Sequence, residues 1–360
     1  MGTVFDYLDW RGDISFGEVG LCEIDGLILS AICYVDFEGI VPTKFDERPI
    51  ALLNAAKAYL RAHKGEKVYM GAILPPSILT LLAKAAKTKR FAGVRLIGYV
   101  NNVDEDAETQ FCALCYLLDD GSVFVAYRGT DDTLVGWKEN FNMSFMDAVP
   151  AQISAAEYMN AAGKINVGKI YTGGHSKGGN LAFYATVKCE EAVRERIITS
   201  YSYDGPGFSQ SFIDGDDYKA VRHKLRSLIP QSSIVGLLLE QEDSYEVVKS
   251  TESGLMQHDP FSWELLGSSL IRLDRITEES RWIDQKLKEL LDDMDAKQRE
   301  ELVKAVYDTL SATSATTLTD INTDKKKLIK AWGGLSEENK AIVTRSIKIL
   351  LKESVKKKKS

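Results

Sequence analysis

The sequence predicts an α/β protein in which helices cover both faces of a mostly parallel sheet. Two observations predict this class. Short runs rich in β-branched and aromatic residues alternate with segments of helical apolar spacing, a pattern that favours parallel strands joined by covering helices. The 360 residues are 44% hydrophobic and 27% charged, which is typical of a globular chain that buries a large core.

The apolar spacing of the first ninety residues is mostly helical, and strand-like runs follow. Helices are predicted at residues 25–37, 47–65, 75–90, 150–164, 178–193 and 217–224. Strands are predicted at residues 93–104, 109–130, 167–174, 196–207, 225–230 and 245–250. Asp120 and Gly121 are turn residues, so they divide the second of these strands into a hairpin.

From about Arg275 the pattern becomes wholly helical, which predicts a helical region appended to the sheet domain. We therefore place one domain at residues 1–272, including the N-terminal helices, and a helical C-terminal region with a basic tail at residues 273–360. Asp295, with Gln298 three positions later, is typical of a capping box that begins a helix within this region.

Charge and hydropathy restrict the partners of this chain. The formal net charge of −7 provides no overall basic field, so we expect no nucleic-acid partner. The sequence has neither a run of about 18 apolar residues nor a signal-like N-terminus, which predicts a cytoplasmic protein. The basic tail at residues 352–360 is expected to be a solvated end, with weak contact to an anionic membrane surface as the alternative. The sequence leaves the oligomeric state open.

The five cysteines are scattered, which argues against a disulfide framework and fits a reducing compartment. Cys112 and Cys115 form a CxxC pair within a predicted strand. Because strand positions three apart point to opposite faces, we expect two core cysteines here rather than a metal or redox site.

Ser176 is surrounded by four glycines in the stretch YTGGHSKGGNLAFYATV, residues 171–187. Residues 174–178 match the pattern G-x-S-x-G, with a predicted strand before them and a predicted helix after them. That context is typical of a nucleophile elbow, in which a serine sits on a sharp strand-to-helix turn. Glycines lack a Cβ, so the strand and the helix can approach closely beneath the serine. The competing interpretation is a glycine-rich turn with a bystander serine.

A serine nucleophile needs a base and an acid, and the chain has four histidines. His258 follows the last predicted strand of the sheet and is the candidate base, with His223 as the alternative. Asp204 ends the strand after the serine strand and is the candidate acid, with Asp243 as the alternative one strand later. Asp204 precedes a Gly-Pro-Gly turn, so a turn-capping role is its competing interpretation.

An oxyanion hole needs two hydrogen-bond donors. We expect one to be the backbone N–H of Lys177, directly after the serine. The second is expected from the loop after the strand that ends at Arg128, where the Thr130 N–H is well placed. Arg128 itself is expected to pair with an acid.

These motifs carry a resemblance to a known family. AYRGTDDTLVGW, followed by TGGHSKGGNLA, resembles the F-R-G-[ST] and G-H-S-L-G-G-x-L-A signature of fungal-type triacylglycerol lipases. With SYDGPGF and QHDPFSW, the chain looks closer still to an uncharacterised bacterial family of lipase-like α/β hydrolases. The resemblance covers about residues 15–270 and implies the α/β-hydrolase fold. It also implies Ser176 as nucleophile, His258 as base and Thr130 in the oxyanion hole.

The chain departs from the lipase signature at two places. Lys177 stands where the signature has an apolar residue beside the nucleophile. The acid motif N-D-x-V-P of the lipases corresponds here to QSSIVG, residues 231–236, which contains serines instead of a carboxylate. Asp204 is proposed as the acid for this reason.

The sequence thus predicts a serine hydrolase that cleaves a small-molecule or lipid acyl ester, and we expect it to use no metal or cofactor. A hydrolase of another acyl bond, a thioesterase or a peptidase, is one alternative, because G-x-S-x-G does not specify the leaving group. A catalytically inactive hydrolase-fold binding module is the other alternative.

Overall fold

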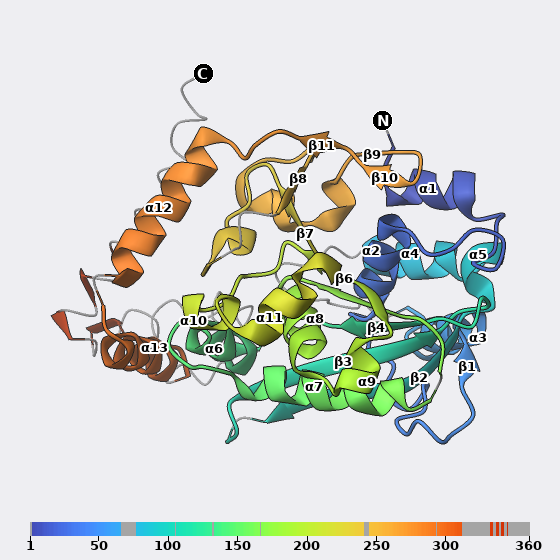
Figure 1. The fold of residues 1–360 in the computed structure, drawn as a ribbon, viewed down its shortest axis with the longest axis horizontal. Helices are drawn as coiled ribbons and strands as arrows, with labels where there is room; N and C mark the ends of the chain where they lie inside the picture. Colours follow the sequence, from blue (N-terminus) through green and yellow to red (C-terminus); the bar gives the residue numbers. More distant parts are fainter. Residues whose placement is uncertain are drawn as a thin grey trace.

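The computed structural model describes residues 2–65, 77–104, 106–131, 133–165, 167–240, 245–292 and 294–311, with a few positions between 332 and 344 (Figure 1). The basic tail at residues 352–360 lies outside the described residues. No helix within these described ranges has the length and hydrophobicity needed to cross a bilayer.

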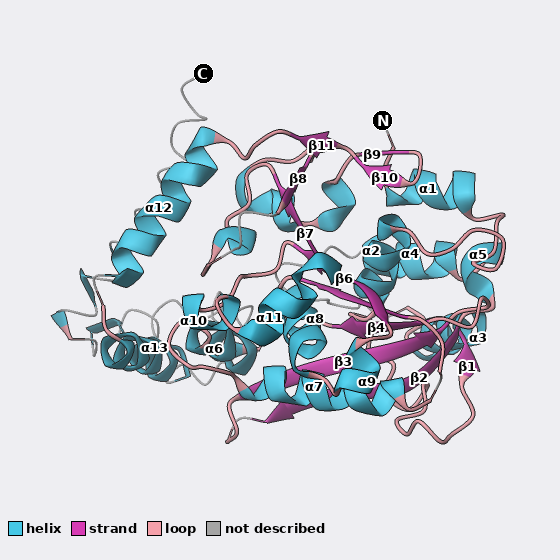
Figure 2. Cartoon of the chain, viewed as in Figure 1, coloured by secondary structure: helices cyan, strands magenta, loops and turns pink. Residues whose placement is uncertain are grey.

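Nine of the described strands form one sheet in the order β1-β2-β3-β4-β5-β6-β7-β8-β11 (Figure 2). Their bounds are β1 Ile50–Ala51, β2 Arg95–Asp104, β3 Thr109–Leu117, β4 Val123–Tyr127, β5 Ile170–His175, β6 Ile197–Tyr203, β7 Leu225–Pro230, β8 Glu246–Val248 and β11 Arg272–Leu273. Strands β4 to β8 are parallel neighbours, and antiparallel strands flank them. A separate antiparallel pair consists of β9 Leu265–Leu266 and β10 Ser269–Leu270.

Helices cover both faces of this sheet, as the sequence predicts (Figure 1). The helices that precede β2 in the chain are α1 Val4–Arg11, α2 Glu23–Ile32, α3 Leu52–Ala62, α4 Ser77–Ala85 and α5 Lys89–Ala92. Those within and after the parallel part are α6 Leu134–Asn142, α7 Pro150–Gly163, α8 Lys177–Lys188, α9 Glu191–Arg194, α10 Gln210–Ile213, α11 Asp216–Val221, α12 Glu278–Asp292 and α13 Ala296–Ser311. Short 3-10 turns are η1 Arg222–Lys224, η2 Val235–Leu237, η3 Gly254–His258 and η4 Pro260–Ser262.

Two hydrophobic cores lie on opposite faces of the sheet. The apolar sides of α1 to α5 pack into one core, and those of α7 and α8 pack into the other. Cys112 belongs to the first core and Cys115 to the second, and both thiols are fully buried. The prediction that this CxxC pair points to both faces of one strand is therefore confirmed.

Among the elements that differ from the sequence prediction are β1 and α6. Residues 47–65 were expected to be one helix, but Ile50 and Ala51 pair with the start of β2 before α3 begins. Helix α6 was not predicted, and it begins where the Thr133 side chain accepts a hydrogen bond from the Gly136 N–H. Pairing with β2 overrides the helical apolar spacing at residues 50–51, and α6 begins at its cap although its own apolar periodicity is weak.

Both C-terminal helices, α12 and α13, contact the sheet domain. Ile276, just before α12, and Ile283, within it, are buried, and the hydroxyl of Ser280 donates to the backbone oxygen of Ser233. Helix α13 lies beside α6, where the Lys138 ammonium stacks on the Tyr307 ring 4.3 Å from its centroid (Figure 1). The predicted capping box of Asp295 and Gln298 is present, but the division at residues 272 and 273 stays a prediction.

Candidate functional site

Ser176 occupies the sharp turn between β5 and α8. Its φ of 58° and ψ of −135° lie in a region that non-glycine residues rarely adopt and that costs about 1–3 kcal/mol. The conformation is held by the Ser176 N–H, which donates to the Tyr203 oxygen at 2.9 Å. A Cβ at Gly174 would lie 2.3 Å from the carbonyl carbon of Gly178, so strand and helix approach as closely as the predicted elbow requires.

The loop after β4 lies directly against this turn. A Cβ at Gly129 would lie 2.5 Å from the His175 oxygen and 3.0 Å from the Cβ of Ser176. A Cβ at Gly178 would lie 2.1 Å from the Tyr127 oxygen. Both positions therefore need glycine. Because glycine has no side chain, residues 128–130 can lie beside the serine.

Asp204 and His258 form a buried pair at the carboxyl ends of the strands. Asp204 follows β6, His258 ends η3, and the His258 Nδ1 lies 2.7 Å from the Asp204 Oδ2. The exposed fractions are 1% for Asp204 and 7% for His258. Since a carboxylate can only accept, the Nδ1–H donates, which leaves Nε2 as the imidazole atom that can accept a proton.

The second oxygen of Asp204 is held by the segment after β7. Its Oδ1 accepts from the Ser233 hydroxyl at 2.5 Å and from the Gly236 N–H at 3.1 Å. The serine-containing stretch QSSIVG, which occupies the place of the lipase acid motif, thus fixes the acid from the neighbouring strand. The alternative base His223 is exposed in η1, and the alternative acid Asp243 lies outside the described residues.

His175 connects Ser176 with His258. The two imidazole rings are 4.4 Å apart between centroids, and the His175 Nε2–H donates to the His258 oxygen at 2.7 Å. On its other side, the Nδ1 of His175 lies 3.2 Å from the Tyr34 hydroxyl, which also accepts from the Gly129 N–H. Burial, with His258 nearby, lowers the pKa of His175 well below its ordinary value, so this ring is a neutral structural link.

One predicted oxyanion donor, Lys177, directly follows Ser176, and the other, Thr130, lies in the loop after β4 that packs against this turn. Lys177 is the first residue of α8, where a backbone N–H has no acceptor within its own helix. Thr130 is mostly buried in the loop after β4, and its hydroxyl accepts from the Asn140 side chain at 2.6 Å. Within the residues that the structure describes, neither backbone N–H has a hydrogen-bond acceptor, so both are available to a ligand.

The side chain of Lys177 enters the protein interior. Its ammonium donates to the Glu139 Oε2 and to the Gln110 oxygen, both at 2.7 Å, and the side chains of Lys177 and Glu139 are 0% exposed. Burial lowers the pKa of the Lys177 ammonium, and the Glu139 carboxylate opposes this effect by stabilising the charged form. Arg128 pairs with Asp131 at 3.1 Å, as expected.

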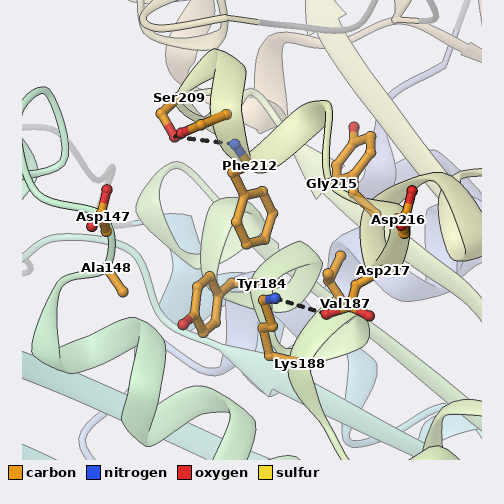
Figure 3. A pocket seen from close by; sticks show the side chains of 12 residues that line it. Asp147, Ala148, Tyr184, Val187, Lys188, Ser209, Phe212, Gly215, Asp216 and Asp217 are labelled. Carbon is orange, nitrogen blue, oxygen red and sulfur yellow. Dashed lines mark hydrogen bonds and ion pairs between the residues drawn. The ribbon is translucent and has the colours of Figure 1, made fainter.

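A separate cavity of about 460 Å³ lies beside the C-terminal half of α8, the end opposite Ser176 (Figure 3). The rings of Tyr184 and Phe212 stack in it, and Lys188 pairs with Asp217 at 2.8 Å. Its described lining residues include none of the predicted site residues. The ion pair neutralises Lys188, and the carboxylates of Asp147 and Asp216 also belong to this lining.

The sequence did not identify the residues that hold the site together, above all Tyr34, Glu139, Asn140 and Ser233. Two features of the sequence indicate that such contacts exist, but they do not indicate which residues make them. Lys177 was a charged residue at a position where the lipase signature is apolar, and the serines of QSSIVG replaced a carboxylate. Both departures are explained by contacts with elements distant in sequence.

The sheet order and the strand–turn–helix at Ser176 define the α/β-hydrolase fold. The chain belongs to the Mbeg1-like family, a lipase-like family whose model matches residues 85–308. The predicted resemblance to lipases is thus confirmed at the level of a lipase-like family.

Solved structures of two lipases are also similar to this chain. The Rhizomucor miehei lipase in its propeptide complex has 14% identity and a TM-score of 0.33, with 49% of this chain and 70% of that chain covered. M37 lipase has 15% identity and a TM-score of 0.35, with 59% and 68% covered. No curated protein matches the chain.

Proposed function

We propose that this protein is a serine hydrolase that cleaves acyl esters through Ser176, His258 and Asp204. The observation that carries the proposal is the buried Asp204–His258 hydrogen bond beside a strained serine turn. A nucleophile, a base and a group that orients the base are the three parts that nucleophilic acyl transfer needs. Membership of a lipase-like family supports the same class of reaction.

In the proposed first step, the Ser176 hydroxyl attacks the ester carbonyl carbon, and the His258 Nε2 takes the hydroxyl proton. Asp204 keeps the imidazole in the tautomer that presents Nε2 as the acceptor and stabilises the imidazolium that forms. The backbone N–H groups of Lys177 and Thr130 donate to the oxyanion of the tetrahedral intermediate. His258 then returns the proton to the leaving alcohol as the C–O bond breaks, which leaves an acyl group on Ser176.

The second half of the proposed reaction repeats these roles with water as the nucleophile. His258 takes a proton from water as its oxygen attacks the acyl carbon, and the same donors hold the second oxyanion. Collapse of this intermediate releases the carboxylic acid and returns the proton to Ser176. In both halves His258 is the group of the chain that accepts the proton from the attacking oxygen and returns it to the departing one.

A fluorophosphonate probe tests the proposal, because it reacts only with a serine that a functioning base activates. We expect the wild-type protein to be labelled at Ser176, and Ser176→Ala and His258→Ala to lose labelling and ester turnover by about 10⁴- to 10⁶-fold. The double variant should be little worse than either single variant, because the residues act as one unit.

A panel of p-nitrophenyl esters and acyl-CoA thioesters of several chain lengths then separates the ester hydrolase from the thioesterase. A folded wild-type protein that is neither labelled nor active on any substrate would contradict the proposal. That outcome would favour a binding module with the hydrolase fold.

A further inference from the structure

We propose that the buried pair of Lys177 and Glu139 holds the two oxyanion donors at the separation that catalysis needs. This inference rests on the proposed function and deepens it, since it assigns positioning roles to side chains of α6 and α8. It concerns the lysine side chain, whereas the proposed oxyanion donor is the backbone N–H of the same residue.

The Glu139 carboxylate joins three elements of the fold. Its Oε2 accepts from the Lys177 ammonium at 2.7 Å and from the Gln110 N–H at 3.1 Å. Its Oε1 accepts from the Ala151 N–H at 2.9 Å. Lys177 in turn donates to the Gln110 oxygen, so β3, α6 and the start of α7 are all tied to the first residue of α8. The position of the Lys177 backbone therefore depends on where α6 lies.

The next residue of α6 holds the other side of the oxyanion site. The Asn140 side chain donates to the Thr130 hydroxyl at 2.6 Å. A Cβ at Gly136 would lie 2.9 Å from the Thr130 methyl group, so α6 packs closely against this loop. One helix thus contacts both proposed donor residues, through Glu139 on one side and through Asn140 on the other.

A positioning role explains why a buried charged pair stands where the lipase signature has an apolar residue beside the nucleophile. The desolvation of two buried charges offsets much of their attraction, so such pairs contribute little net stability compared with a well-packed apolar pair. Hydrogen bonds constrain the charged pair more than packing would constrain an apolar pair. Glu139 accepts three hydrogen bonds and Lys177 donates two, which fixes both side chains. An apolar pair would fill the volume without fixing the distance between α6 and α8.

The test replaces both charges with apolar residues of similar volume, in Lys177→Met/Glu139→Leu, and leaves the backbone donors in place. We expect kcat to fall about 10²-fold with KM within about threefold of the wild type, since misplaced oxyanion donors affect only the transition state. Inhibition by a trifluoromethyl ketone, whose adduct with the serine carries an oxyanion, should weaken by a similar factor. The melting temperature should fall moderately, because the N–H groups of Gln110 and Ala151 lose the carboxylate that accepts from them.

Two further variants keep the inference falsifiable if the double variant folds poorly. Asn140→Ala removes one hydrogen bond to Thr130 and should lower kcat about tenfold at unchanged KM. Lys138→Met/Glu108→Gln breaks the ion pair one position away on the same helix and should leave kcat and KM unchanged.

The outcomes separate this inference from the proposed function. Labelling of the wild type at Ser176, with kcat and inhibitor affinity retained in both Lys177→Met/Glu139→Leu and Asn140→Ala, would overturn the positioning role and leave the hydrolase intact. Absence of labelling in the wild type would overturn both. The single variant Lys177→Met should lose thermal stability, because it leaves Glu139 buried without its partner. Adding Glu139→Leu should recover part of the lost melting temperature, because it removes the unpaired buried charge, but should not recover kcat.

Discussion

Replacement of Asp204 by asparagine tests the geometry of the site most directly. The substitution keeps the volume and one oxygen that can accept from the Ser233 hydroxyl and the Gly236 N–H. The other carboxylate oxygen becomes an NH₂ group that faces the His258 Nδ1 at the present distance of 2.7 Å. An NH₂ group cannot accept the Nδ1 proton, so the ring is expected to carry its proton on Nε2 instead.

The magnitude follows from this change of tautomer. With a proton on Nε2, the imidazole presents a donor to Ser176 and cannot take the hydroxyl proton. Loss of the correct tautomer at a buried triad of this kind lowers kcat by about 10⁴-fold, which corresponds to about 5.4 kcal/mol of activation free energy. Because asparagine is isosteric and uncharged, we expect the melting temperature to change much less than the rate.

Steady-state ester hydrolysis and thermal unfolding of the same preparations measure the two effects. Asp259→Asn is the matched control: this carboxylate adjoins His258 in sequence but accepts from the Phe261 N–H, so kcat should stay within a few-fold of the wild type. Asp243→Asn should likewise have a small effect. A larger loss from Asp243→Asn than from Asp204→Asn, at unchanged thermal stability, would refute the assignment of the acid.

Three further outcomes are expected. Gly178→Ala should lower the melting temperature strongly, because its Cβ would lie 2.1 Å from a backbone oxygen, whereas Gly93→Ala enters open space and should add about 0.4–1 kcal/mol to the free energy of unfolding. Since the folded state disfavours protonation of His175, urea unfolding should show stability falling below about pH 6.5, by up to about 1.4 kcal/mol per pH unit from this residue, and His175→Gln should remove that contribution. A chain ending at Arg275 loses the buried Ile276 and Ile283 and should lose about 3–6 kcal/mol in the same assay; unchanged stability would contradict the packing described.

The parts of the site that the sequence predicts are those that local geometry determines. Ser176 was identified because the elbow is formed by consecutive residues whose glycines have a specific steric role. Asp204 and His258 were identified because each follows a strand of a parallel sheet, and the carboxyl ends of such strands share one edge. The predicted ends of these two strands therefore placed Asp204 and His258 at the same edge of the sheet, where the structure has their hydrogen bond.

The contacts of α6 could not be predicted in the same way. This helix has a weak apolar stripe, and Glu139 is fully buried although glutamate is usually exposed. Its burial depends on an ammonium group 38 residues later and on two backbone N–H groups from β3 and α7. Nothing in the local pattern around Glu139 indicates those partners, since each comes from an element that the helix meets only in the folded protein.

The link from Ser280 through Ser233 to Asp204 has a consequence for the order in which the protein becomes active during its synthesis. A ribosome releases the chain from the N-terminus, so the serine, the acid and the histidine all emerge before α12. The segment that orients Asp204 is completed only when Ser280 and the isoleucines around it arrive. The proposed hydrolytic activity is therefore expected only after α12 has been synthesised and has packed against the segment that holds Asp204. Shorter nascent chains would lack this contact.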